Sequence, residues 1–139
     1  MRPTRILLIE DDPADLLLTR RALSQTPLQV GLSVVTSSAM AQEHLYRRGN
    51  FADAVRPDLI LLDLSLPDDS GLSLLKIIKS DPALTIIPVI ALTAPDTDVA
   101  RAYALQASSC VCKPADLDSF ITTIEAIAHF WLTVARLPP

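Results

Sequence analysis

The chain has 139 residues, half of them hydrophobic, which is enough for one domain with its own core. Its formal net charge of −4 argues against a nucleic-acid partner, because contact with phosphate backbones requires a basic surface. No apolar run approaches the roughly 20 residues of a membrane-spanning helix, and the N-terminus lacks a signal-peptide pattern. We therefore expect a soluble, cytoplasmic protein without membrane contact, with a single domain over residues 1–139.

Short apolar segments recur along the chain and predict strands. They lie at 6–9, 30–35, 59–62, 86–92 and 109–112. The segments ILLI and LILL are continuous runs, which is typical of strands buried on both faces of a parallel sheet. Cys110 and Cys112 form a C-x-C in the last segment, which fits two small strand residues better than a metal site.

Helical segments separate these strands. They are expected from Pro13 to a point before Pro27, from Ser37 or Ser38 to Arg48, and at 72–79, 99–106 and 117–135. Asp12 fits the N-cap of the first helix, and Asp96 or Thr97 fits that of the fourth. Alternating strands and helices with short connections imply right-handed crossovers and a parallel sheet covered by helices on both faces.

Polar residues follow four of the predicted strands. Glu10 and Asp11 follow the first strand, Asp63 the third, Thr93 the fourth and Lys113 the fifth. Because ligands bind beyond the carboxyl ends of the strands in open α/β sheets, we expect these side chains in one site. Asp68 and Asp69 lie in a turn-rich stretch and are expected to be turn residues outside it.

This set of side chains predicts a phosphoryl-acceptor site. Clustered carboxylates repel one another, and an oxygen-only cluster suits a hard cation such as Mg²⁺. A carboxylate is also a nucleophile toward phosphorus and can form an aspartyl phosphate. A metal ion on one side and Lys113 on the other would neutralise the transferred phosphoryl group, and Thr93 could donate a hydrogen bond to it.

The chain resembles the receiver domain of two-component response regulators over essentially its whole length. The matching segments are ILLIEDDP (6–13), PDLILLDLSLPDDSG (57–71), IPVIALTA (87–94) and CKP (112–114). The resemblance implies an α/β, flavodoxin-like (βα)5 fold, a doubly wound five-stranded parallel sheet in the order 2-1-3-4-5. It also implies signalling by phosphoryl transfer from a sensor histidine kinase.

The resemblance implies roles for the acidic residues. Asp63 would be the phosphoacceptor. Asp11 and Asp63 would bind Mg²⁺ directly, and Glu10 would hold a metal-bound water. Ser65, two residues after the acceptor, would contribute its backbone carbonyl to the metal.

The other matching residues also receive roles from the resemblance. Thr93 would be the switching hydroxyl, and Lys113 would contact the phosphate. Pro67 and Gly71 match the loop after the acceptor. Pro114 stands where the family usually has a cis peptide bond, which proline permits.

One position departs from the family pattern. The family often has Tyr or Phe three residues before the lysine, where it swings inward with the threonine on activation, and Cys110 stands there. Movement of Thr93 is still expected, but an aromatic switch at this position is in question. Tyr103, in the predicted fourth helix, is the alternative aromatic.

The segments RRGNFADAVRPDLILLDLSLP and HFWLTVARLPP are similar to a narrower group, the small single-domain response regulators of bacterial and cyanobacterial phytochromes. This similarity implies a phytochrome histidine kinase as donor, and a homodimer. No sequence for an output domain follows the last helix, so output by binding is expected. Phe130, Trp131 and Leu132 are consecutive, so at least one should leave the core and join a dimer interface of the fourth helix, fifth strand and fifth helix.

Two other functions compete with the signalling module. An aspartyl-phosphate phosphohydrolase usually needs a second carboxylate two residues after its nucleophile as general acid, and that position holds Ser65. A phosphorylation-independent dimeric scaffold would not need the complete set of acceptor, metal ligands and lysine. The sequence therefore favours a phosphoacceptor over an enzyme that acts on other substrates.

Overall fold

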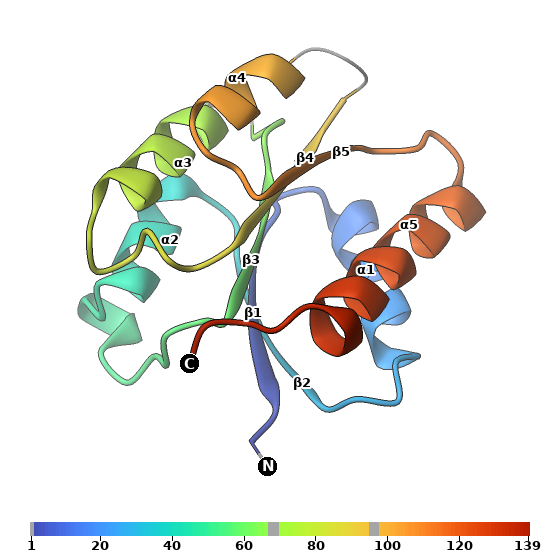
Figure 1. The fold of residues 1–139 in the computed structure, drawn as a ribbon, viewed down its shortest axis with the longest axis horizontal. Helices are drawn as coiled ribbons and strands as arrows, with labels where there is room; N and C mark the ends of the chain where they lie inside the picture. Colours follow the sequence, from blue (N-terminus) through green and yellow to red (C-terminus); the bar gives the residue numbers. More distant parts are fainter. Residues whose placement is uncertain (1, 67–69, 95–97) are drawn as a thin grey trace.

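The computed structural model describes residues 2–66, 70–94 and 98–139, which form one parallel sheet between two layers of helices (Figure 1). The strands are β1 (Thr4–Ile9), β2 (Val30–Val35), β3 (Leu59–Asp63), β4 (Val89–Thr93) and β5 (Ser109–Cys112). They pair in the order β2-β1-β3-β4-β5, and every pairing is parallel. The expected doubly wound topology is confirmed.

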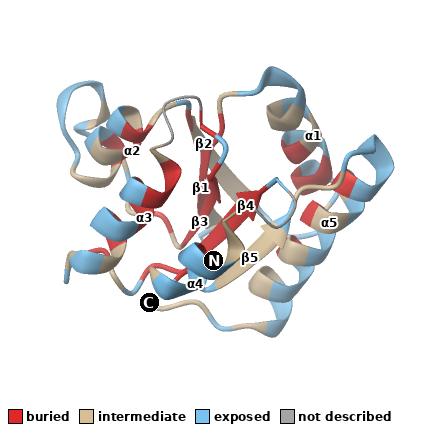
Figure 2. Cartoon of the chain, turned by 90° about the horizontal axis from the view of Figure 1, so that it is seen from above, coloured by how far each residue is buried: buried red, intermediate tan, exposed pale blue. Residues whose placement is uncertain are grey.

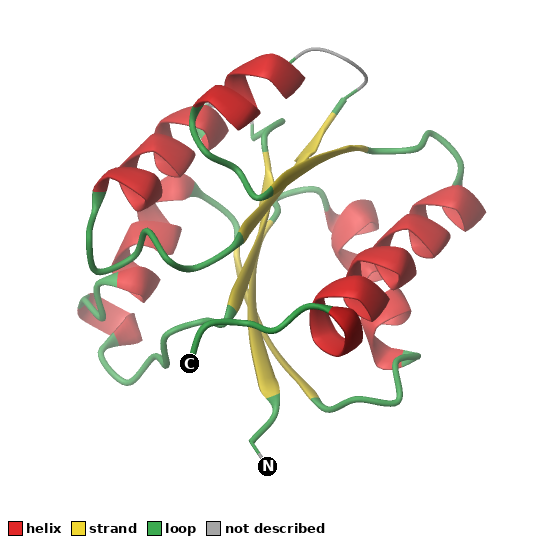
Figure 3. Ribbon diagram, viewed as in Figure 1, coloured by secondary structure: helices red, strands yellow, loops and turns green. Residues whose placement is uncertain are grey.

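The helices lie on both faces of the sheet (Figure 3). They are α1 (Pro13–Ser24), α2 (Ser38–Leu45), α3 (Gly71–Ser80), α4 (Val99–Ala104) and α5 (Leu117–His129), with a short 3-10 helix at η1 (Gly49–Phe51) and a π-helical segment at η2 (Phe130–Val134). Helices α1 and α5 pack together on one face, and α2, α3 and α4 cover the other. No helix in the described part of the chain has the length and apolar character to cross a membrane.

The central strands are buried on both faces, which explains their continuous apolar runs (Figure 2). Leu7 and Ile9 of β1 join the core beneath α2, α3 and α4. Ile6 and Leu8 of the same strand join the core beneath α1 and α5. Since successive side chains of a strand point to opposite faces, each strand serves both cores and fixes the position of its own carboxyl end.

The helix starts follow the expected capping chemistry. The Asp12 carboxylate accepts a hydrogen bond from the backbone N–H of Ala14 at 2.9 Å, and Ser37 caps α2 through the N–H of Met40 at 3.1 Å. The residue before α4 is Asp98. The expectations for Pro67, Asp68, Asp69, Asp96 and Thr97 lie outside the described residues.

Several boundaries differ from the expected ones, and three of them have a visible cause. Strand β4 begins at Val89 and not at 86, because the N–H of Ile87 closes a turn onto the carbonyl of Leu84 at 3.0 Å. Helix α2 ends at Leu45 rather than Arg48, and α4 ends at Ala104 rather than Gln106. Positive φ angles of 55° at Arg47 and 71° at Gln106 end these helices, although neither residue is glycine. Helix α5 and the following segment η2 together cover residues 117–134, close to the last helix expected at 117–135.

The start of α3 at Gly71 lies directly against the end of β3, and this close approach leads to a stability prediction. A Cβ at this position would lie 2.8 Å from Leu64 Cα and 3.1 Å from the Asp63 carbonyl oxygen. Gly71→Ala should therefore lower the free energy of unfolding by about 1–3 kcal/mol, as measured by urea denaturation. Gly31→Ala is the matched control, since its Cβ would meet nothing closer than 3.9 Å. Equal stability of the two variants would contradict the close contact.

Candidate functional site

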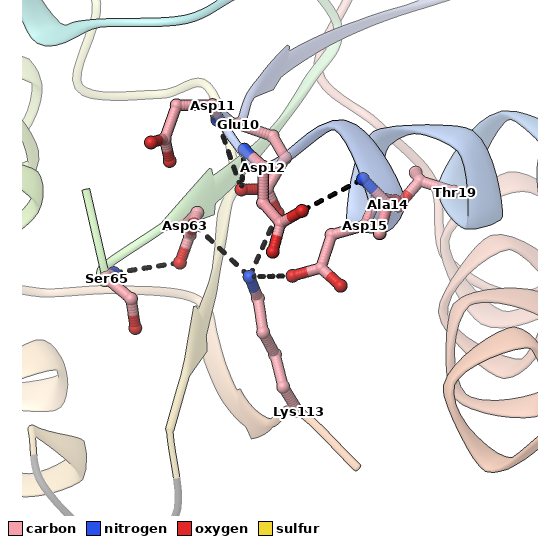
Figure 4. Close-up of polar contacts among 9 residues, drawn as sticks. All are labelled: Glu10, Asp11, Asp12, Ala14, Asp15, Thr19, Asp63, Ser65 and Lys113. Atoms are coloured by element: carbon pink, nitrogen blue, oxygen red, sulfur yellow. Dashed lines mark hydrogen bonds and ion pairs between the residues drawn. The ribbon is translucent and has the colours of Figure 1, made fainter. Parts of the chain in front are cut away.

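Glu10, Asp11, Asp63 and Lys113, at the ends of three of the strands, meet at the carboxyl edge of the sheet (Figure 4). Glu10 extends from the end of β1, Asp63 ends β3 and Thr93 ends β4. All three are almost fully buried, with exposed fractions of 1%, 2% and 1%. Buried ionisable groups require partners, so the neighbours of Glu10 and Asp63 determine what the site can do.

Three carboxylates form a cluster that fits a hard divalent cation. Glu10, Asp11 and Asp63 each place a carboxylate oxygen within 4.8 Å of the others. Asp11 is only partly buried, so the cluster is open to solvent on one side. A set made only of oxygen ligands, with room for water, matches the preference of Mg²⁺ and Mn²⁺.

Lys113, directly after β5, supplies the positive charge of the site. Its Nζ lies 2.9 Å from Glu10 Oε1, 2.8 Å from Asp15 Oδ2 and 3.2 Å from Asp63 Oδ2. Its side chain is only 14% exposed. The sequence therefore predicted correctly that Glu10, Asp11, Asp63 and Lys113 come together.

The charges of the site shift two pKa values. Burial, together with the hydrogen bond and charge of Asp63, raises the pKa of Glu10 to about 8 despite the opposing effect of Lys113. Burial would lower the pKa of Lys113, but its hydrogen bonds to Asp15 and Glu10 outweigh burial and raise it. One ammonium thus faces more negative charge than it neutralises, which favours an additional cation.

Backbone hydrogen bonds fix the acceptor and Thr93. The N–H of Ser65 donates to Asp63 Oδ1 at 2.8 Å, so the loop after β3 holds the carboxylate in place. The N–H of Lys113 donates to the carbonyl of Thr93 at 2.8 Å and extends the β4–β5 ladder by one residue. Thr93 and Lys113 are therefore neighbours at the same edge.

The peptide bond between Lys113 and Pro114 is trans, which corrects the expected cis bond. The trans form is the lower-energy isomer of a proline peptide bond, although the difference is small.

Asp15 belongs to the site and was missed by the sequence analysis. It lies in the first turn of α1, and its carboxylate makes the shortest of the three contacts to Lys113 Nζ. The available signal was its position, one helical turn beyond Asp11 on the helix that follows β1. That signal does not identify the partner, because Lys113 is 98 residues away in the sequence.

Tyr103 contacts the strand that carries Cys110. Its hydroxyl accepts a hydrogen bond from the backbone N–H of Cys110 at 3.2 Å, and its side chain is 51% exposed. The aromatic at this surface therefore comes from α4 and not from β5. It links the helix to the edge strand.

Comparison with known proteins places the chain in a family. The model of the response regulator receiver domain matches residues 6–125, and the chain belongs to this family. Receiver domains of response regulators are signalling modules that accept a phosphoryl group on an aspartate. The acidic cluster, the lysine and the sheet described above are the parts that this chemistry requires.

The similar proteins include regulators from phytochrome systems. The chain is 34% identical over 138 residues to the response regulator Rcp1 of Synechocystis, covering 98% of this chain and 94% of Rcp1. The phosphorylated cyanobacterial phytochrome response regulator RcpA matches at 36% identity and a TM-score of 0.95, over 99% of this chain and 100% of RcpA. The bacteriophytochrome response regulator RtBRR matches at 37% identity and a TM-score of 0.76, over 99% of this chain and 86% of RtBRR. A structure of Rcp1 contains Mn²⁺.

The acidic cluster generates a prediction for metal binding. A cation bound only by the folded protein should stabilise it by about 2.7 kcal/mol at a concentration about 100-fold above its Kd. Asp11→Asn removes one of the clustered carboxylates and should weaken binding of Mn²⁺ or Mg²⁺ by about 10-fold or more, measured by thermal shift during titration. Asp12→Asn is the matched control, because asparagine caps a helix as well as aspartate does. The same loss in both variants would place the cation elsewhere.

Proposed function

We propose that the chain is a single-domain response regulator that accepts a phosphoryl group from a sensor histidine kinase on Asp63. The observation that carries the proposal is the environment of this carboxylate. It is buried, its Oδ1 accepts from the Ser65 N–H, and its Oδ2 faces Lys113 Nζ at 3.2 Å. Glu10 is also buried, accepts backbone N–H groups and contacts Lys113, but Asp63 is the residue that stands at the acceptor position of the receiver motif PDLILLDLSLPDDSG (57–71).

The chemistry is a phosphoryl transfer between two side chains. A carboxylate oxygen of Asp63 attacks the phosphorus of a phosphohistidine, a P–O bond forms, and the P–N bond breaks with its electron pair leaving on the imidazole. Lys113 is close enough to Asp63 to pair with the negative charge of the transferred group, and Thr93 would donate its hydroxyl to it.

Mg²⁺ is the cation that we assign to the cluster. Its protein ligands would be Asp11, Asp63, the backbone carbonyl of Ser65 and, through a water molecule, Glu10. When bound, the ion supplies the positive charge that Lys113 alone does not provide. The oxygen-only ligand set and the partly open position at Asp11 support this assignment.

The protein would catalyse only its own phosphorylation and dephosphorylation. Turnover of other phosphate esters would need a general acid beside the acceptor, and the residue two positions after Asp63 is Ser65. The side chain of Ser65 is exposed, and its backbone N–H already bonds to the acceptor. These features speak against the alternative phosphohydrolase.

The donor that we propose is a phytochrome-type histidine kinase. The support is the similarity, over nearly the whole chain, to Rcp1, RcpA and RtBRR. A scaffold that works without phosphorylation would have no use for the buried acceptor site. We therefore prefer the phosphoacceptor function to this alternative.

For the output, we propose a homodimer through α4, β5 and α5. Among Phe130, Trp131 and Leu132, Phe130 is the exposed one at 48%, whereas the other two are half-buried against the core beneath α1 and α5. Val134 of η2 and Tyr103 of α4 also expose large side chains. Aromatic residues of this kind often anchor protein interfaces.

The first prediction of this proposal concerns the acceptor. With Mg²⁺ and a small phosphodonor such as acetyl phosphate, the protein should gain one phosphoryl group that is labile to base and hydroxylamine. Asp63→Asn should not gain it, because the amide is not a nucleophile toward phosphorus. Intact-mass spectrometry measures the product, and Asp53→Asn, an exposed acid outside the site, is the control. A stoichiometric label that persists in Asp63→Asn would exclude this acceptor.

The second prediction concerns the dimer. Phe130→Ala should raise the dimer dissociation constant by about 10-fold or more, because buried aromatic anchors carry a large share of interface energy. Sedimentation or light scattering measures the solution mass before and after phosphorylation. Leu17→Ala removes another exposed hydrophobic side chain, 67% exposed on α1, and should leave the mass distribution unchanged. A protein that is monomeric in both states would contradict the proposed interface.

A further inference from the structure

The ammonium group of Lys113 has a third carboxylate partner that lies outside the acidic cluster. Asp15 Oδ2 lies 2.8 Å from Nζ, while the clustered carboxylates are those of Glu10, Asp11 and Asp63. Figure 4 shows Nζ between Asp15 on one side and Asp63 on the other. A lysine ammonium has three donors, and the hydrogen bonds to Glu10 and Asp15 use two of them, while the contact to Asp63 is an ion pair.

Asp15 is held firmly by the fold. It lies in the first turn of α1, which the Asp12 carboxylate caps at the N–H of Ala14. Its own carbonyl accepts a hydrogen bond from Thr19 Oγ1 at 2.8 Å, and α1 packs against α5. The carboxylate is 23% exposed, so solvent competes only in part for its contact with Lys113.

The three contacts of Nζ change differently when the acceptor is phosphorylated. Formation of the acyl phosphate uses one oxygen of the Asp63 carboxylate, and the contact from Nζ to Asp63 is the longest of the three at 3.2 Å. The contacts to Glu10 and Asp15 do not involve the reacting carboxylate. Two donors can therefore stay in place while the third is available to a phosphoryl oxygen.

We infer that Asp15 is a positioning residue for the phosphoryl transfer: it anchors Lys113 Nζ from α1 so that the ammonium stays beside Asp63 and the transferred group. This inference rests on the proposed function of Asp63. Asp15 acts only through Lys113, since it touches neither the acceptor nor the cluster in the described contacts.

The kinetic test replaces Asp15 by asparagine, which keeps the shape and removes the charge. With acetyl phosphate and Mg²⁺, the maximal rate constant for labelling Asp63 should fall about 10-fold in Asp15→Asn, because a misdirected catalytic group loses much of its effect. The Mg²⁺ concentration for half-maximal rate should change by less than about 2-fold, since Asp15 lies outside the cluster. Asp118→Asn, an exposed acid in the first turn of α5, controls for loss of one negative charge.

A spectroscopic test follows the anchor itself without phosphorylation. The chain has three lysines, so the side-chain ammonium signals in ¹H–¹⁵N spectra can be assigned by substitution. The protons on Nζ of Lys113 should exchange with water faster in Asp15→Asn than in the wild type, while far-UV circular dichroism stays unchanged.

The outcomes separate the two proposals. A labelled wild type with an unchanged or faster rate in Asp15→Asn would overturn the role of Asp15, and so would a large shift in the Mg²⁺ requirement, which would make it a metal-site residue. An unlabelled wild type would overturn the phosphoacceptor function and, with it, any role of Asp15 in the reaction. Unchanged exchange at Lys113 Nζ would show that Asp15 is no anchor.

Discussion

The contact between the Lys113 ammonium and the buried carboxylates of Glu10 and Asp63 joins the elements of this protein into one site. The carboxylates repel one another and are shielded from water, so their positions are stable only with a cation between them. Lys113 follows β5 at the far end of the sheet from β2, and Glu10 follows β1. One long side chain thus connects strands that are not neighbours.

The parallel topology makes this connection possible. Because all strands run the same way, their carboxyl ends bring residues 10, 63, 93 and 113 to one edge, although they are distant in the sequence. The strands themselves are held by cores on both faces, so the edge residues have rigid supports. The reactive groups can then carry unfavourable charge, since stability comes from the buried apolar layers beneath them.

The sequence was sufficient where local pattern and position decide the structure. Continuous apolar runs identified β1 and β3, strand ends identified Glu10, Asp63 and Lys113, and the resemblance to receiver domains supplied the strand order. It failed where an unusual local conformation or a contact between distant segments decides. The early end of α2 depends on the left-handed conformation of Arg47, and the membership of Asp15 depends on how far Lys113 reaches toward α1. Neither has a distinctive local sequence signal.

The hydrogen bond from Cys110 to Tyr103 has a consequence for the exposed edge of the sheet. Strand β5 is an edge strand of only four residues, and unpaired N–H groups on such a strand can pair with a strand from another chain. The hydroxyl of Tyr103 occupies the N–H of Cys110, so an incoming strand cannot use that donor while α4 stays in place. A helix of only six residues thus supplies one of the hydrogen bonds that strand addition at this edge would otherwise use.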